Sequence, residues 1–296
     1  MRRKNIFELL SSNFNLATEA VRIDRLFRKE ILFGDWSLSK EYGIPEPENH
    51  TLTSFVDKFC FEDWKNRGRF IDVDDFLTSI DYENRFYLGK SGVLEHFIEL
   101  IEIVYNFWQM AENKRKENNA DLSYYSDFVH LQSTMNEVLA YFNHKAVYDD
   151  VTEQVFVIED KPEVTAVAEI VEPELALSVL RYNHHAMQGN VEAKRSVLNA
   201  MGQALEPKEK ELKTVNPIIK DNVFYMLNNL HIRHNNIRKD EKYYKEYIAM
   251  MEPDELELWY DELYQMMLLA NLELDQVERT SRCKELRAKI EGGSVK

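Results

Sequence analysis

Two short segments of the chain combine histidine with arginine and asparagine. They are Arg181-Tyr182-Asn183-His184-His185 and His231-Ile232-Arg233-His234-Asn235-Asn236, and they hold four of the eight histidines in the sequence. Arginine offers a planar fork of donors to a phosphate, and histidine can accept or release a proton near neutral pH. These residue types are typical of sites that handle phosphate, so both segments are candidate sites.

The distribution of charge favours the same two segments. The whole chain has a formal charge of −15, which disfavours indiscriminate attraction to nucleic acid. Residues 181–245, however, contain twelve Lys and Arg against seven Asp and Glu, so this window is +5 and the remainder is −20. Residues 246–275 then contain nine acidic residues and no basic one. This acidic stretch is either the solvated face of an amphipathic helix or a surface that recruits a protein partner.

Composition predicts a mainly α-helical protein, because glycine and proline are few and helix-forming residues dominate. The two cysteines, Cys60 and Cys283, are too few for a disulfide framework and favour a reducing compartment. Neither a secretory signal nor an uncharged membrane span of about 20 residues is recognisable. We therefore expect a cytoplasmic protein without membrane contact.

The elements that must position these segments fall into two regions. Residues 1–145 are expected to form a helical N-terminal domain, whose role the sequence does not indicate. Its first helix is predicted from Ile6 to Phe33, followed by a loop to Leu52. Apolar residues run almost continuously from Val93 to Met110, which predicts a central helix, and Leu122 to Phe142 is its expected partner.

The second region, residues 146–296, is expected to hold one small β-hairpin and a helical bundle. The strands are predicted at Val155–Ile158 and Val164–Ile170, because apolar and β-branched residues there surround a turn at Asp160-Lys161-Pro162. A helix is then predicted from Pro173 to Gly189, which would place Arg181 on the same face as His184, His185 or both.

Further helices are predicted in this second region. A short helix from Asn190 and a linker at Pro207 precede a helix opened by Asn216-Pro217, whose apolar stripe extends to His234. The last helix begins at Pro253. Its apolar band is wide enough for a homodimer interface or for one core, and comprises Trp259, Tyr260, Leu263, Met266 and Met267.

Arg233-His234 resembles part of the signature of HEPN domains, helical domains found in prokaryotic abortive-infection and toxin proteins. That signature has an arginine, a polar residue, three further residues and a histidine, and here Arg238 stands in place of the final histidine. The resemblance covers roughly residues 146–290. It implies RNA as the ligand, cleavage of RNA without a metal, a homodimer and a setting in phage defence.

Cleavage of RNA by its own 2′-hydroxyl needs a base, an acid and positive charge on the transition state. Arg233 would then hold the phosphate and His234 or His184 would exchange the proton, with Asn235 or Asn183 orienting a ring. The remaining candidates for binding are Arg181, His185, His231, Asn236 and Arg238. In the alternative hypothesis the same side chains stabilise helix ends, and the chain is a non-catalytic interaction protein.

Other classes of site are not indicated. The sequence has no Gly-rich phosphate loop, no G-x-S-x-G elbow, no C-x-x-C pair and no H-E-x-x-H motif. A zinc site built from the clustered histidines lacks a carboxylate at a suitable position. We therefore expect no metal and no cofactor.

Overall fold

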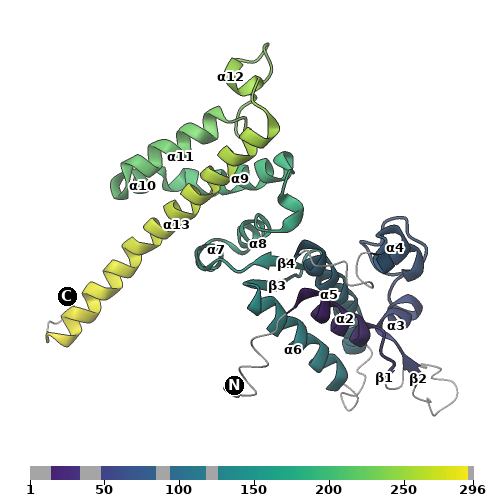
Figure 1. The fold of residues 1–296 in the computed structure, drawn as a ribbon. Helices are drawn as coiled ribbons and strands as arrows, with labels where there is room; N and C mark the ends of the chain where they lie inside the picture. The colour runs from purple at the N-terminus through teal and green to yellow at the C-terminus, as the bar shows by residue number, and fades with distance from the viewer. Residues whose placement is uncertain (1–14, 34–47, 85–93, 118–125, 293–296) are drawn as a thin grey trace, which may run out of the picture. The chain divides into compact units, whose positions relative to one another are not determined.

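The computed structural model describes residues 15–33, 48–84, 94–117 and 126–292, and the chain divides into two compact units, residues 1–157 and 158–296 (Figure 1). Helices dominate both units, which confirms the mainly α-helical prediction. Each described sheet has only two strands, β1 with β2 and β3 with β4. Within the described segments, no helix is both long and apolar enough to cross a bilayer.

The described part of unit 1 starts with α2 (Leu16–Phe27), where the Asn15 side chain accepts hydrogen bonds from the first backbone amides of the helix. The helix ends at Phe27, and the chain then forms β1 (Ile31–Phe33). The prediction of a helix as far as Phe33 is therefore wrong, while residues 6–14 of that helix lie outside the described residues. β1 pairs antiparallel with β2 (Glu48–His50), in a stretch predicted to be a loop.

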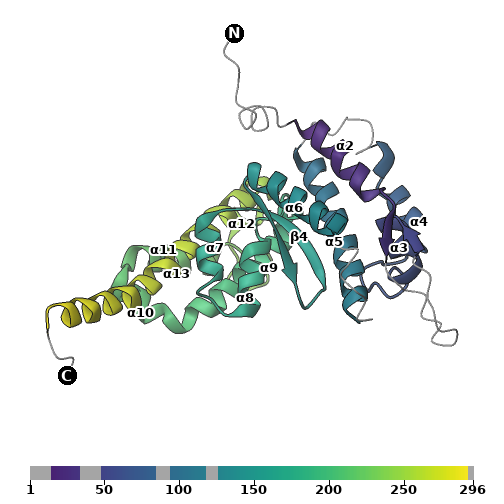
Figure 2. The ribbon, with the colours of Figure 1, turned by 90° about the horizontal axis from the view of Figure 1, so that it is seen from below.

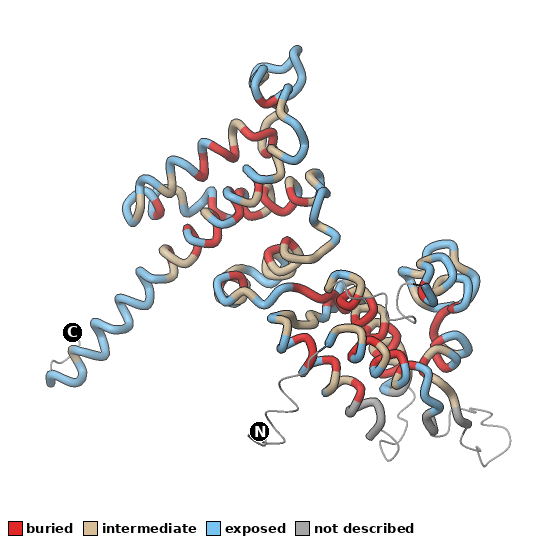
Figure 3. Tube along the Cα trace, in the orientation of Figure 1, coloured by how far each residue is buried: buried red, intermediate tan, exposed pale blue. Residues whose placement is uncertain are grey.

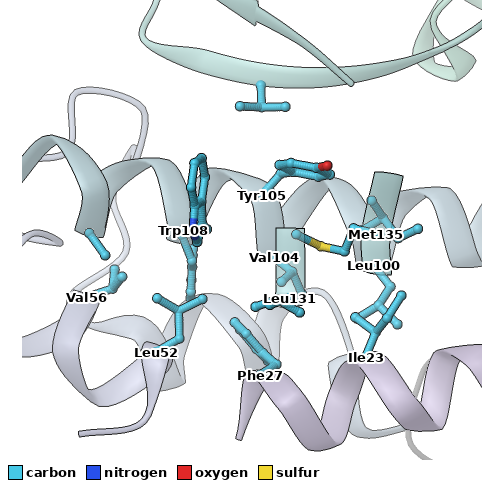
Figure 4. Packing of buried hydrophobic residues seen from close by; sticks show 14 of the residues in the cluster. Ile23, Phe27, Leu52, Val56, Leu100, Val104, Tyr105, Trp108, Leu131 and Met135 are labelled. Carbon is cyan, nitrogen blue, oxygen red and sulfur yellow. The ribbon is translucent and has the colours of Figure 1, made fainter. Parts of the chain in front are cut away.

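The other helices assigned within the described residues of unit 1 are α3 (Leu52–Phe59), α4 (Val73–Ser79), α5 (Leu94–Glu117) and α6 (Ser126–Tyr141). The α5 helix lies at the centre of the core, as predicted. Figure 4 shows its side chains between those of the surrounding helices, and Figure 3 shows the same stretch as a buried part of the trace. The buried α5 residues include Phe97, Leu100, Ile101, Val104, Tyr105 and Trp108.

The strand predicted at Val155–Ile158 is present and forms a hairpin, but its partner is not the predicted strand at Val164–Ile170. β4 (Gln154–Glu159) pairs with β3 (His144–Asp149), which precedes it, rather than with Val164–Ile170. Pro162 instead occupies the first turn of α7 (Pro162–Ala168), where its missing N–H costs no hydrogen bond. Val164 and Val167, three residues apart on one helical face, are buried. The division into units falls within β4, whereas the expected domain boundary, between residues 145 and 146, falls within β3.

Unit 2 is a helical bundle. It contains α7, α8 (Pro173–Arg181), α9 (Val191–Leu205), α10 (Glu209–Val215), α11 (Pro217–Asn229), α12 (Glu246–Ala249) and α13 (Pro253–Ile290). The long α13 helix packs against α7, α9, α10 and α11, and Figure 2 shows it running beside α10 and α11. Helix starts at Pro173, Asn190, Asn216-Pro217 and Pro253 are confirmed.

The linker predicted at Pro207 is a short connection. Pro207 lies in a 3-10 turn (Glu206–Lys208) that joins α9 directly to α10, a helix that was not predicted. In the apolar band proposed as a dimer interface, Tyr260, Leu263 and Met267 are fully buried in the core of the unit itself. These three side chains are therefore not available to a second copy.

Candidate functional site

The first histidine segment lies in a turn rather than in a helix. The α8 helix ends at Arg181, and His184 precedes the 3-10 turn His185–Met187. His184 forms an isolated antiparallel bridge with Ile158, at the end of β4. This bridge requires extended backbone, so the predicted helix cannot continue to Gly189, and Arg181 does not share a helical face with the two histidines.

A polar cavity of about 250 Å³ lies beside this turn. It is formed by the end of β4, the start of α7, the turn after α8, and one face each of α9 and α13. The lining residues are Glu159, Lys161, Tyr182, Asn183, His184, His185, Met187, Gln188, Lys194, Asp261, Tyr264 and Gln265. Three predicted binding residues, Asn183, His184 and His185, therefore share one cavity.

Two stacked tyrosines form one wall of this cavity. The rings of Tyr182 and Tyr264 are 3.9 Å apart between centroids and almost parallel, at 7°. Asn183 Nδ2 donates to the Tyr264 hydroxyl at 2.9 Å, and that hydroxyl donates to the Val179 carbonyl at 2.8 Å. Burial raises the pKa of both phenols, and the Asp261 carboxylate raises that of Tyr182 further. Both rings are therefore neutral donors, and Asn183 is held in place by the wall.

Lys194 of α9 also lines the cavity, and it is only 5% exposed. Its Nζ lies 2.8 Å from Glu257 Oε1 and 2.6 Å from Asp261 Oδ1, both on α13. The hydrogen bond from Lys194 lowers the pKa of Glu257, although burial opposes this shift. Gly189 N also donates to Glu257 Oε1 at 2.9 Å. Lys194 is therefore a charge-paired link between two helices, because two carboxylates surround it.

These contacts limit the chemistry of the cavity. Lys161 Nζ lies 2.9 Å from Glu159 Oε2, so both lysines that line the cavity are matched by carboxylates. His184 Nδ1 accepts from the Ala186 amide at 3.2 Å, so the neutral ring carries its proton on Nε2. The arrangement suits hydrogen bonding to a polar ligand better than it suits stabilisation of a strongly anionic phosphate transition state.

The second histidine segment belongs to a loop after α11, defined here as the basic loop, residues 231–245. Asn236 is fully buried and organises it. Its Oδ1 accepts from His231 N at 2.8 Å, and its Nδ2 donates to the carbonyls of Asn228 at 3.2 Å and Tyr243 at 2.8 Å. His231 has a φ of +58°, so the helix cannot continue, and the predicted extension of its apolar stripe to His234 is wrong.

His231 is part of this frame as well. Its Nδ1 accepts from Asn236 N at 3.3 Å, and its side chain is buried. Burial lowers the pKa of His231, and the neighbouring Arg195 charge lowers it further. The ring is therefore neutral near pH 7, which suits a structural acceptor.

Arg233 is directed to the end of α9. Its Nη2 donates to the Gly202 carbonyl at 2.9 Å, and its guanidinium lies 5.1 Å from the centre of the Phe224 ring. Glu206 adds an ion pair at 3.8 Å, and the Arg233 side chain is 14% exposed. A cation near the last carbonyls of a helix stabilises that helix end. The geometry thus fits a structural contact between α9 and α11.

The solvent-facing side of the basic loop carries a different set of groups. The His234 ring stacks on Tyr243, with centroids 4.0 Å apart and planes at 15°. Lys242 Nζ lies 5.1 Å from the Tyr243 ring centre. Asn235 Oδ1 accepts from Arg238 N at 3.2 Å, and the exposed Arg238 side chain pairs with Asp240 at 3.1 Å. Asn235 therefore shapes the loop, while His234, Arg238 and Tyr243 reach solvent.

The two segments contribute to different places in unit 2. Residues 183–185 line the cavity, and none of the described residues 231–238 does. Lys161, Lys194 and Tyr264 were missed in the sequence analysis, because they meet the histidines only in the folded unit. One signal was present: Glu257 and Asp261 lie four residues apart on the same face of a helix, so a single cation could pair with both.

Comparisons with known proteins do not extend the resemblance carried by Arg233-His234. No protein-family model matches the chain. No curated protein matches it, and neither does any solved structure.

Proposed function

We propose that the chain binds single-stranded RNA through the basic loop, and that it does not use Arg233 to cleave the RNA. The observation that carries this proposal is the stacked pair of His234 and Tyr243 on the solvent side of the loop. A nucleobase can stack on an aromatic ring that is held in place, and such stacking accepts any of the bases.

The charge around this pair supports an anionic ligand. Arg238, Lys239, Lys242 and Lys245 are exposed, against Asp240 and Glu241 in the same stretch. Lysine and arginine beside a stacking ring are the combination by which proteins follow a single-stranded backbone. The resemblance of Arg233-His234 to the HEPN signature adds RNA as the class of ligand and phage defence as the setting.

The contacts of Arg233 favour binding over cleavage. A catalytic arginine has to offer its guanidinium to the phosphate, whereas this one donates to the Gly202 carbonyl and lies on Phe224. Arg238 occupies the position of the final histidine in the HEPN signature, so the usual proton donor is also missing. RNA is therefore held by the loop without a catalytic pair at Arg233.

A binding assay tests the proposal. Fluorescence anisotropy with a labelled 12-nucleotide RNA, at low salt with EDTA, should report binding by the wild-type chain. Tyr243→Ala should weaken it about 5- to 160-fold, because one stacked base contributes about 1–3 kcal/mol. Tyr141→Ala, an exposed tyrosine of unit 1, is the matched control and should bind like wild type. No binding would favour the non-catalytic protein-interaction alternative, and equal binding by Tyr243→Ala would place the RNA site outside the stacked pair.

A separate gel assay tests the proposal that the chain does not use Arg233 to cleave RNA. RNA incubated with wild type in EDTA should remain intact over hours, and Arg233→Ala should behave identically. Cleavage by wild type that Arg233→Ala abolishes would restore Arg233 as a catalytic residue.

A further inference from the structure

The polar cavity beside the turn after α8 takes no part in the proposed RNA binding. None of the described residues 231–245 lines it, and all twelve lining residues belong to unit 2, so one compact unit forms it. Its volume is about 250 Å³. A cavity of about 150 Å³ can hold one benzene ring, so this cavity has room for a single six-membered ring with small substituents.

The charged groups of the cavity are matched in pairs. Two lysines and two carboxylates line it. Lys161 Nζ lies 2.9 Å from Glu159 Oε2, and Lys194 Nζ lies 2.6 Å from Asp261 Oδ1. A charged ligand would be attracted by one member of each pair and repelled by the other. An uncharged ligand leaves both pairs intact and is therefore favoured.

Each of these carboxylates uses one oxygen for its lysine. Asp261 Oδ1 also accepts from the Tyr182 hydroxyl at 2.9 Å. Within the part of the chain that the structure describes, neither Glu159 Oε1 nor Asp261 Oδ2 has a hydrogen-bond partner. Both side chains are partly exposed. Each carboxylate therefore has one acceptor oxygen available to a ligand.

The cavity also offers donors. Lys161 Nζ has three N–H groups and two protein acceptors, Glu159 Oε2 and Asn183 Oδ1 at 3.2 Å, so one N–H remains for a ligand. Gln188 and Gln265 are exposed, and their side-chain amides make no hydrogen bond to any described residue. An amide both donates and accepts, so the cavity presents both kinds of hydrogen-bonding group.

Part of the cavity wall is fixed before any ligand binds. The Tyr182 and Tyr264 rings stack, Asn183 donates to the Tyr264 hydroxyl, and Lys194 is buried between its carboxylates. Binding then costs little ordering of these side chains, which favours a small ligand with few contacts.

We propose that the cavity binds a small uncharged polyol, a free monosaccharide in its six-membered ring form. A hydroxyl group both donates and accepts a hydrogen bond. Hydroxyls of one sugar can therefore donate to Glu159 Oε1 and Asp261 Oδ2 and accept from Lys161 Nζ. A carboxylate or phosphate only accepts and an ammonium only donates, so neither matches both sets of groups. The site is separate from the basic loop, and the proposal does not depend on RNA binding.

A saturation-transfer NMR titration of the full chain tests this proposal. The probes are D-glucose, D-galactose, D-mannose and D-xylose, with glucose 6-phosphate and glucosamine as charged counterparts. At least one uncharged sugar should bind saturably with a Kd on the order of 1 mM. Both charged counterparts should bind about tenfold more weakly than the best uncharged sugar.

Two variants locate the site. Glu159→Gln removes a charged acceptor and should weaken sugar binding about tenfold. Because it also leaves Lys161 without its carboxylate, it should strengthen the binding of glucose 6-phosphate. Gln265→Ala, at an exposed position on α13, should weaken sugar binding about fivefold with little change in stability.

The matched control is Glu262→Gln, the same change of charge at an exposed residue that does not line the cavity. It should bind sugar like wild type, and circular dichroism should show the same helix content in all variants. The proposal is overturned if none of the four sugars binds saturably, or if glucose 6-phosphate or glucosamine binds wild type more tightly than they do. Unchanged sugar binding in both Glu159→Gln and Gln265→Ala would also overturn it.

Discussion

At the scale of single residues, Asn236 has the clearest structural role in the basic loop. Asn236→Ala removes the acceptor for His231 N and the donor for the carbonyls of Asn228 and Tyr243, and Asn236 itself is fully buried. We expect the free energy of unfolding to fall by about 2–4 kcal/mol, because unsatisfied buried polar groups keep their desolvation cost. Urea titration measures this loss. Asn235→Ala, at a half-buried position, should cost under about 1 kcal/mol, and equal losses would contradict the assigned role.

Arg233 provides a second test at the same scale. Replacing a structural arginine lowers the free energy of unfolding, whereas replacing a ligand-binding arginine lowers the affinity for the ligand. Arg233→Ala removes the hydrogen bond to the Gly202 carbonyl and the contact with Phe224. We expect the free energy of unfolding to fall by about 1–3 kcal/mol, with RNA affinity unchanged. Urea titration and anisotropy on the same preparation separate the two effects. Lost affinity with unchanged stability would show that Arg233 contacts the ligand.

At the scale of elements, Lys194 and Glu257 link α9 to α13, and this link predicts a pH dependence. The folded-state pKa of Glu257 is lowered, chiefly by the hydrogen bond from Lys194. Its stabilising contribution is therefore fully present above the unfolded pKa of about 4.3, and is lost as the pH falls through the folded value. Stability measured by urea at pH 7 and at pH 3 should fall less for Glu257→Gln than for wild type.

The matched control for this prediction is Glu262→Gln, an exposed carboxylate on the same helix. Its pH dependence should follow that of wild type, because Glu262 is exposed and lies outside the contact of Lys194 with Glu257 and Asp261. If Glu257→Gln also follows wild type between pH 7 and pH 3, the contact with Lys194 does not stabilise the bundle.

At the scale of the whole molecule, the charge of −15 predicts that RNA binding is modest and depends weakly on salt. The basic loop offers four exposed cations, Arg238, Lys239, Lys242 and Lys245. A single strand loses about 0.7 log units of affinity per tenfold salt for each phosphate contact, so the slope should not exceed about −3. Anisotropy across a KCl series measures it. A slope near −6 would require basic groups outside this loop.

Helix starts and the central apolar helix were predictable from the sequence because their causes are local. Asn190 and Asn216 accept hydrogen bonds from the first amides of α9 and α11, and Pro253 occupies the first turn of α13. The buried face of α5 follows from the spacing of its own apolar residues. Each of these features depends on residues within a few positions of one another.

Only the tertiary structure decided where helices and strands end and which side chains contact one another. The bridge between Ile158 and His184 ends the α8 region early, and pairing with β3 sets the hairpin. The role of Arg233 likewise depends on Gly202, which belongs to another helix. Such contacts join residues far apart in sequence, and their free energy outweighs local preference, so the pattern around each histidine could not reveal them.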